Sequence, residues 1–210
     1  MTDFQLNKAK EIYTKSLGNA FRGQVYSDVS GEVREPIFFN ISRNNRFNLK
    51  SLNLSTMYMG FEPLTALVEC FSEFRYSSLP INIKLGRSRL SKFELIEFRL
   101  KQNLKLVNMQ DSGALIRHRL KRDAPLFSST KSHADSEDFA KQAVSLGYDG
   151  ILFPTRQGVE KAAVIFEGAK NKLDNYEIIN RSSFWEAFNN SKDLISDLNI
   201  QLIDDTLGYT

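Results

Sequence analysis

Apolar side chains recur along this chain with two different spacings, which predict short strands and helices. Period-two alternation indicates strands at 21–26, 56–59, 79–85, 93–100, 104–108, 150–155 and 162–166. Spacings of three and four residues indicate helices at 3–17, 64–74 and 132–146, and a helical tail at about 181–197. We therefore expect an α+β fold in a single compact domain over residues 1–210, with mixed or antiparallel central sheets flanked by helices.

Residues with special backbone roles support three of these boundaries. Gly18 follows the first helical pattern and is a plausible stop signal. Pro63 suits the first turn of a helix, where its missing N–H costs nothing. The helix predicted at 132–146 has three acids near its start and Gly147 at its end, which makes it the strongest helix signal in the chain.

Length and composition indicate one soluble domain. The chain has 210 residues, of which 41% are hydrophobic, and this suffices for one well-filled core. No apolar run approaches the roughly 20 residues that a bilayer requires, and the N-terminus lacks a signal-peptide pattern. The single cysteine, Cys70, excludes an internal disulfide and a zinc site built from several cysteines. We expect a cytoplasmic protein that contacts no membrane.

Charge is distributed unevenly along the chain. The formal net charge is +3, yet the segment 84–122 carries eleven Lys and Arg against three acids, a balance of +8 that leaves −5 for the remainder. Such a segment could contact phosphates. Its bases interleave with apolar residues in the way expected of a core-facing strand with a solvated face, and this second interpretation is favoured.

Signatures of several common enzyme classes are absent. The chain contains no GxxxxGK[ST], GxGxxG, HExxH or GxSxG motif. It is therefore not a standard nucleotide-loop protein.

Three side chains that can do chemistry stand at the ends of consecutive short elements: Arg46, Tyr58 and Glu69. An arginine, a tyrosine and a glutamate in this order could assemble a site for an anionic, aromatic ligand. A buried ion pair between Arg46 and Glu69 would explain both charges without a ligand, and Tyr58 is by default a core aromatic. Taken alone, these residues favour the simpler explanation.

The order of several short motifs resembles the RES domain family, which is named for an arginine, a glutamate and a serine. The family pattern has an aromatic residue and arginine, then Arg-(Phe/Trp)-Asn, a strand tyrosine, a helix with Ala-Leu and a glutamate, and later Gly-x-Asp-Gly, a short strand and a serine. Over about residues 20–168 the chain supplies Phe21-Arg22, Arg46-Phe47-Asn48, Tyr58, Ala66-Leu67 with Glu69, Gly147-Tyr148-Asp149-Gly150 and Val164-Ile165-Phe166. Thr155 stands where the family has its serine, and it keeps the hydroxyl but adds a methyl group and a stiffer side chain.

The resemblance implies a compact fold similar to that of ADP-ribosyltransferase toxins, and an enzyme that breaks the nicotinamide–ribose bond of its substrate NAD⁺ without a metal. Members of the family are mostly toxins that deplete NAD⁺ and are held inactive by a protein antitoxin that covers the site. Contact with nucleic acid is then expected only through an antitoxin. A homodimer is left open.

Within that resemblance the site residues take defined roles. The catalytic set is Glu69, Arg46 and Thr155, with the Glu69 carboxylate facing the positive charge that develops on the ribose. The NAD⁺-binding set is Arg22, Arg46, Tyr58 and Thr155. The arginines would hold the pyrophosphate through paired charge-assisted hydrogen bonds. Tyr58 would stack on the nicotinamide or bond to a ribose, and Thr155 would orient the ribose.

Two classes of function stay open. One is the NAD⁺-consuming enzyme, for which hydrolysis, phosphorolysis and transfer of ADP-ribose to a protein share the same first step. The other is a catalytically inactive RES-like binding module, in which the basic segment 84–122 binds an acidic protein or a nucleic acid.

Overall fold

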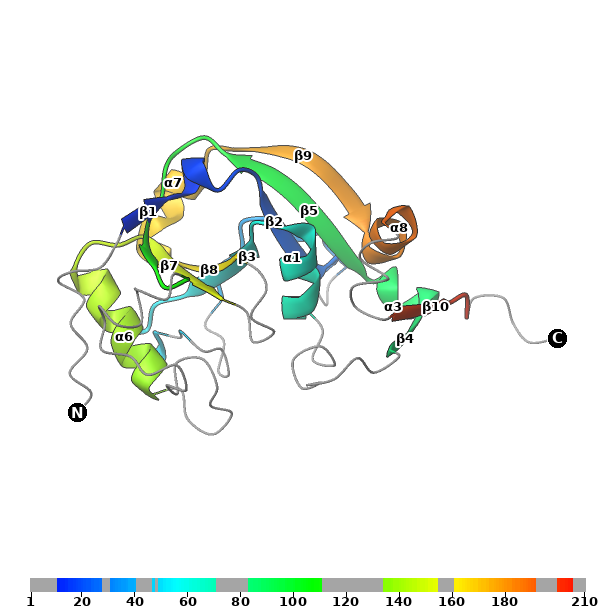
Figure 1. The fold of residues 1–210 in the computed structure, drawn as a ribbon, viewed down its shortest axis with the longest axis horizontal. Coiled ribbons are helices and arrows are strands. Elements are labelled where there is room, and N and C mark those ends of the chain that lie inside the picture. Colours follow the sequence, from blue (N-terminus) through cyan, green and yellow to red (C-terminus); the bar gives the residue numbers. More distant parts are fainter. Residues whose placement is uncertain are drawn as a thin grey trace.

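The fold is built on one large mixed sheet. This computed structural model describes residues 11–27, 31–40, 47, 49–70, 83–110, 134–154, 161–191 and 200–205. Eight strands form the sheet in the order β1-β6-β7-β8-β3-β2-β5-β9 (Figure 1). Neighbouring strands are antiparallel except β6 and β7, which are parallel. The bounds are β1 Glu11–Tyr13, β2 Ala20–Val25, β3 Thr56–Gly60, β5 Phe93–Leu100, β6 Lys105–Asn108, β7 Gly150–Pro154, β8 Lys161–Phe166 and β9 Tyr176–Ser183.

Helices cover both faces of this sheet. They include α1 (Pro63–Cys70), α3 (Arg87–Leu90), α6 (Ala134–Ser145), α7 (Lys170–Leu173) and α8 (Phe184–Asn190). α6 packs with β7 and β8 in one buried cluster, and α1 and α8 share a second cluster with the start of β5. α7 belongs to a third cluster with Met57 and Met59 of β3. These two side chains lie on the sheet face opposite α1, because side chains alternate between the two faces of a strand. A smaller parallel pair of strands, β4 (Ile83–Gly86) with β10 (Ile200–Ile203), lies beside α3 (Figure 1).

Two glycines let α1 lie close against neighbouring strands. A Cβ atom at Gly23 of β2 would lie 2.5 Å from Sγ of Cys70 and 2.9 Å from the carbonyl oxygen of Ala66. A Cβ atom at Gly60 of β3 would lie 2.7 Å from Cβ of Thr65. Any side chain at these positions would push the helix away, because protein interiors are already close-packed. α1 therefore bridges β2 and β3 at short range.

The sheet opens between these same two strands. Among the described residues, Phe21 and Gly60 are the only ladder pair between β2 and β3. By contrast, β2 pairs with β5 along its whole length, and β3 pairs with β8 along its whole length. The strands β2 and β3 thus diverge beyond their single pair, and their facing edges are left for side chains or a ligand.

The helix expected at 3–17 is wrong over the part that the structure describes. Glu11–Tyr13 form β1, which pairs with Lys105–Val107 of β6, and Thr14–Ser16 form one 3-10 turn. The buried Thr14 donates from its amide to the carbonyl of Leu104 (3.2 Å), and its hydroxyl accepts from the amide of Leu104 (3.0 Å). Pairing with a sheet edge here overrides the helical spacing. Residues 3–10 lie outside the described residues.

The helical tail expected at about 181–197 begins later than predicted. Arg181–Ser183 end the long strand β9, where Arg181 lies opposite Ile96 of β5. α8 starts at Phe184 with a capping box, in which the Ser183 hydroxyl accepts from the amide of Glu186 and the Glu186 carboxylate accepts from the amide of Ser183. The helix ends at Asn190, and residues 192–199 lie outside the described residues.

Most other predicted elements are confirmed. The strands β2 to β8 and the helices α1 and α6 occur where the apolar spacings place them, within a few residues. Parts of four predicted elements, at 71–74, 79–82, 132–133 and 155, lie outside the described residues. α1 begins at Pro63, and Gly147, with φ of +73°, follows the end of α6. β9, β10, α3 and α7 were not predicted. In the described part of the chain no helix is long and apolar enough to cross a membrane.

Replacing Gly23 by alanine should destabilise the protein. The new Cβ would meet Cys70, the ring of Phe184 and a backbone carbonyl, so either α1 or β2 must move. We expect the free energy of unfolding, measured by urea denaturation, to fall by about 1–3 kcal/mol. Gly168→Ala is the matched control, because a Cβ there meets nothing within 4 Å. Equal stability of both variants would contradict the close packing of α1.

Candidate active site

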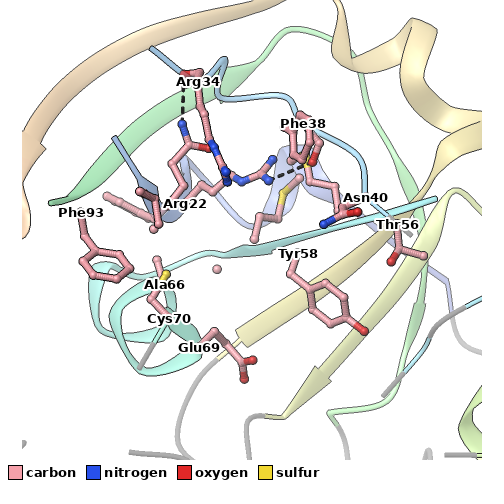
Figure 2. Close-up of a pocket in the computed structure, with 17 residues that line it drawn as sticks. Arg22, Arg34, Phe38, Asn40, Thr56, Tyr58, Ala66, Glu69, Cys70 and Phe93 are labelled. Carbon is pink, nitrogen blue, oxygen red and sulfur yellow. Dashed lines mark hydrogen bonds between the residues drawn. The ribbon is translucent and has the colours of Figure 1, made fainter. Parts of the chain in front are cut away.

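A cavity of about 310 Å³ lies where β2 and β3 diverge (Figure 2). Its walls come from β2, β3, the end of α1 and the segment 34–40, so it collects side chains from both faces of the sheet. The lining side chains that carry charge or can form hydrogen bonds include Arg22, Gln24, Arg34, Asn40, Tyr58 and Glu69. Three of the residues expected from the sequence, Arg22, Tyr58 and Glu69, therefore surround one cavity.

Arg22 points to the sheet face opposite α1, because strand alternation places it away from its neighbour Gly23. Its guanidinium group donates to the carbonyl oxygens of Pro36 (2.7 Å) and Phe38 (2.8 Å). Burial, with a smaller repulsion from Arg34, lowers the pKa of Arg22 to about 10. The side chain is therefore still a cation at neutral pH, and it is held by neutral carbonyl groups.

Arg34 also lines the cavity, although it was not among the residues expected from the sequence. It lies in the segment 31–40, which forms no helix and no named strand, and its guanidinium carbon lies 5.8 Å from the centroid of the Phe38 ring. Within the described ranges neither Arg22 nor Arg34 forms an ion pair with a carboxylate. Two cations without a bound carboxylate therefore line one part of the cavity.

Tyr58 fixes the chain next to a predicted site residue. The Tyr58 hydroxyl accepts a hydrogen bond from the backbone amide of Phe47 (3.1 Å). The rings of Phe47 and Tyr58 both pack on Phe153 of β7, with centroids 5.0 Å and 6.1 Å from it. The chain is thus anchored to β3 at the residue that directly follows Arg46. Arg46 itself lies outside the described residues.

Glu69 lies in the last turn of α1, next to the half-buried Cys70, and both line the cavity. Figure 2 shows the side chains of Glu69 and Tyr58 on one side of β3, and Arg22 and Arg34 on the other. Glu69, Arg22 and Arg34 therefore line one cavity, but the carboxylate and the arginines lie on opposite sides of β3. Thr155 directly follows the end of β7 at Pro154 and lies outside the described residues.

Asp149, in the Gly-x-Asp-Gly motif, has a structural role. Its carboxylate accepts from the backbone amide of Lys105 (2.8 Å) and from the ammonium group of Lys172 (2.7 Å to each oxygen). Its own backbone amide donates to the carbonyl of Lys105, and its carbonyl accepts from the amide of Phe166. This one residue thus ties together β6, the start of β7, the end of β8 and α7.

The cavity offers a particular set of interactions to a ligand. Cations lie on one side and a carboxylate on the other. Gln24 Oε1 and Thr56 Oγ1, which are buried in residues that line the cavity, have no hydrogen-bond partner within the described part of the chain. An anionic ligand that also carries hydroxyl groups would match the cations and the carboxylate. The described residues include no group of three or more His, Cys, Asp or Glu that could hold a metal ion.

Comparison with known sequences identifies the class of protein. The RES domain family model matches residues 25–186, which is well over half of the chain. The chain therefore belongs to the RES domain family. Tyr58, Glu69 and Asp149 lie within the matched range, and Arg22 lies just before it.

Comparison with solved structures supports the same fold. A chain in the crystal structure of the M. tuberculosis MbcT–MbcA toxin–antitoxin complex superimposes with a TM-score of 0.55. The two chains are 12% identical, and the match covers 80% of this chain and 87% of that one. At this identity the likeness shows a shared α+β fold and nothing finer. A search of curated protein sequences gave no match.

Replacing Tyr58 by phenylalanine should weaken the anchoring of the chain at Phe47. The substitution leaves the ring in place and removes the acceptor of the Phe47 amide, so we expect a loss of about 0.5–1.5 kcal/mol in the free energy of unfolding. Tyr13→Phe is the control, because the Tyr13 hydroxyl bonds to Glu11 at the exposed surface. If urea denaturation gives the same loss for both variants, the Tyr58 hydroxyl is not an anchor.

Proposed function

We propose that this chain is an NAD⁺-consuming toxin that cleaves the nicotinamide–ribose bond of NAD⁺ in the cytoplasm and is neutralised by a cognate protein antitoxin. The observation that carries the proposal is the cavity between β2 and β3, which is lined by the carboxylate of Glu69 and by two arginines that form no ion pair with any carboxylate in the described part of the chain. Membership of the RES domain family supports it. So does the shared fold with a chain of a toxin–antitoxin complex.

Glu69 is the proposed catalytic carboxylate. Breaking the bond from ribose to a cationic pyridinium leaves positive charge on the ribose in an oxocarbenium-like transition state. A carboxylate that accepts hydrogen bonds from the ribose hydroxyls and faces this charge stabilises the transition state more than the substrate. The position of Glu69 on the cavity wall is suited to this role. The mechanism needs no covalent nucleophile from the protein.

The arginines are the proposed holders of the pyrophosphate. Arg22 is a cation whose donors meet carbonyls rather than a carboxylate, so its charge stays available to an anion. Arg46 is assigned the same task from the family pattern, and the backbone amide of the residue that follows it, Phe47, is bonded to the Tyr58 hydroxyl. Tyr58 would stack on the nicotinamide or bond to a ribose, and Thr155 would orient the ribose.

The fate of the ADP-ribosyl group distinguishes three related activities. Water would give hydrolysis, inorganic phosphate would give phosphorolysis, and a protein side chain would give ADP-ribosylation. All three release nicotinamide in the same first step. A catalytically inactive binding module is the remaining alternative.

Glu69→Gln should abolish release of nicotinamide from NAD⁺ by the purified protein. The amide keeps the shape of the side chain and removes the negative charge, so we expect turnover to fall by about 100-fold or more. Glu62→Gln is the control, because Glu62 is exposed just before α1 and is not part of the cavity lining. Assays with and without inorganic phosphate separate hydrolysis from phosphorolysis.

Full activity in a folded Glu69→Gln variant would exclude the proposed mechanism. The same variants test toxicity in cells. Expression of the wild-type chain without an antitoxin should lower cellular NAD⁺ and stop growth, and expression of Glu69→Gln should do neither. Growth arrest by both variants would separate toxicity from NAD⁺ cleavage.

Thr155 provides a second test through its hydroxyl group. If the hydroxyl orients the ribose, Thr155→Ser should keep or raise turnover, whereas Thr155→Val should lower it roughly three- to tenfold because valine keeps the shape and deletes the hydrogen bond. The rate of nicotinamide release is the measurement. Equal rates for all three proteins would remove Thr155 from the site.

A further inference from the structure

The backbone of Arg34 is held by side chains that project from the sheet beneath it. The Arg34 carbonyl oxygen accepts hydrogen bonds from Nε2 of Gln24 (3.1 Å) and from Nη2 of Arg181 (2.9 Å). The Arg34 amide donates to the carbonyl of Tyr26 (3.1 Å). The backbone amide and carbonyl of Arg34 are therefore both hydrogen-bonded, although the residue lies outside every helix and named strand.

Glu94 in turn fixes the two side chains that hold Arg34. Glu94 is only 2% exposed, and its carboxylate accepts from Nε of Arg181 (2.6 Å) and Nε2 of Gln24 (2.9 Å). The strand register explains the contact: Gln24 lies directly opposite Glu94, and Arg181 lies opposite Ile96, two residues further along the same face. The hydrogen bonds to Glu94 raise the pKa of Arg181. The charge of Arg181 is thus compensated within the protein.

The charge of Arg34, unlike that of Arg181, is not compensated by a carboxylate in the described part of the chain. Its guanidinium group lies over the Phe38 ring and has no ion pair within the described ranges, and it repels the nearby Arg22. Both side chains line the cavity. Two neighbouring cations are unfavourable until an anion lies between them, and a diphosphate with charge on both phosphates suits two forked donors.

We infer that Arg34 binds the diphosphate of the dinucleotide together with Arg22, and that Arg181 is a positioning residue that holds Arg34 through its carbonyl group. The inference rests on the proposed function for the identity of the ligand. It adds a binding residue from the segment 31–40 and gives a role to the ion pair between β5 and β9. Arg181 itself need not touch the ligand.

Binding of ADP-ribose, measured by calorimetry, tests the role of Arg34 without turnover. Arg34→Gln should weaken the binding of ADP-ribose about tenfold or more, and should weaken AMP, which has one phosphate, by a smaller factor. Arg99→Gln is the matched control: it removes the same charge from an arginine whose side chain is 57% exposed on β5. Unchanged affinity in Arg34→Gln, or an equal loss in Arg99→Gln, would overturn the inference.

A double-mutant cycle tests whether Arg181 acts through Arg34. Arg181→Lys keeps the charge next to Glu94 but lacks the fork that reaches both Glu94 and the Arg34 carbonyl, so ADP-ribose affinity should fall by several-fold. In the double variant Arg181→Lys/Arg34→Gln the affinity should match that of Arg34→Gln alone. Independent losses that multiply in the double variant would show that Arg181 does not act through Arg34.

The binding assay and the turnover assay test the two proposals independently. If ADP-ribose binding depends on Arg34 and no nicotinamide is released from NAD⁺, the proposed catalysis is wrong and the binding role of Arg34 stands. If nicotinamide is released and ADP-ribose binding is independent of Arg34, the proposed catalysis stands and the binding role of Arg34 is wrong.

Discussion

The close contact of α1 with β2 and β3 is the constraint on which the candidate site depends. Gly23 and Gly60 leave no side chain between the helix and the two strands. The helix therefore crosses the place where the sheet opens, and its last turn brings Glu69 to the wall of the cavity. Were either glycine larger, the helix would move outward and carry the carboxylate with it.

Two arginines on one sheet face have opposite electrostatic surroundings. Arg181 bonds to the buried carboxylate of Glu94, which raises the pKa of Arg181. The two opposite charges largely cancel within this pair. Arg22 meets the carbonyl groups of Pro36 and Phe38, and burial lowers its pKa. Carbonyl groups orient a guanidinium without neutralising it. The first arrangement is that of a structural pair, and the second leaves a fixed positive charge in the cavity wall.

The sequence could predict strands that bury most of their side chains in the core, and it failed for a strand that buries few. β5, β7 and β8 are largely buried and were predicted, whereas the edge strand β9 is exposed over most of its length. β1 was mistaken for part of a helix because three residues are too few to establish a period, and only its partner β6 makes them a strand. The motif order pointed to Glu69 and Tyr58, and both line the cavity. No motif pointed to Arg34, because its carbonyl contact with Arg181 spans 147 positions in sequence.

The family motifs divide into those that shape the fold and those that line the cavity. Asp149 joins β6, β7, β8 and α7 through backbone and ammonium groups, so it sets the position of the strand that carries Phe153. Phe153 supports the rings of Phe47 and Tyr58, and the Tyr58 hydroxyl holds the backbone next to Arg46. A motif residue remote from the ligand can therefore matter to the site through packing alone, and motif membership by itself does not assign a catalytic role.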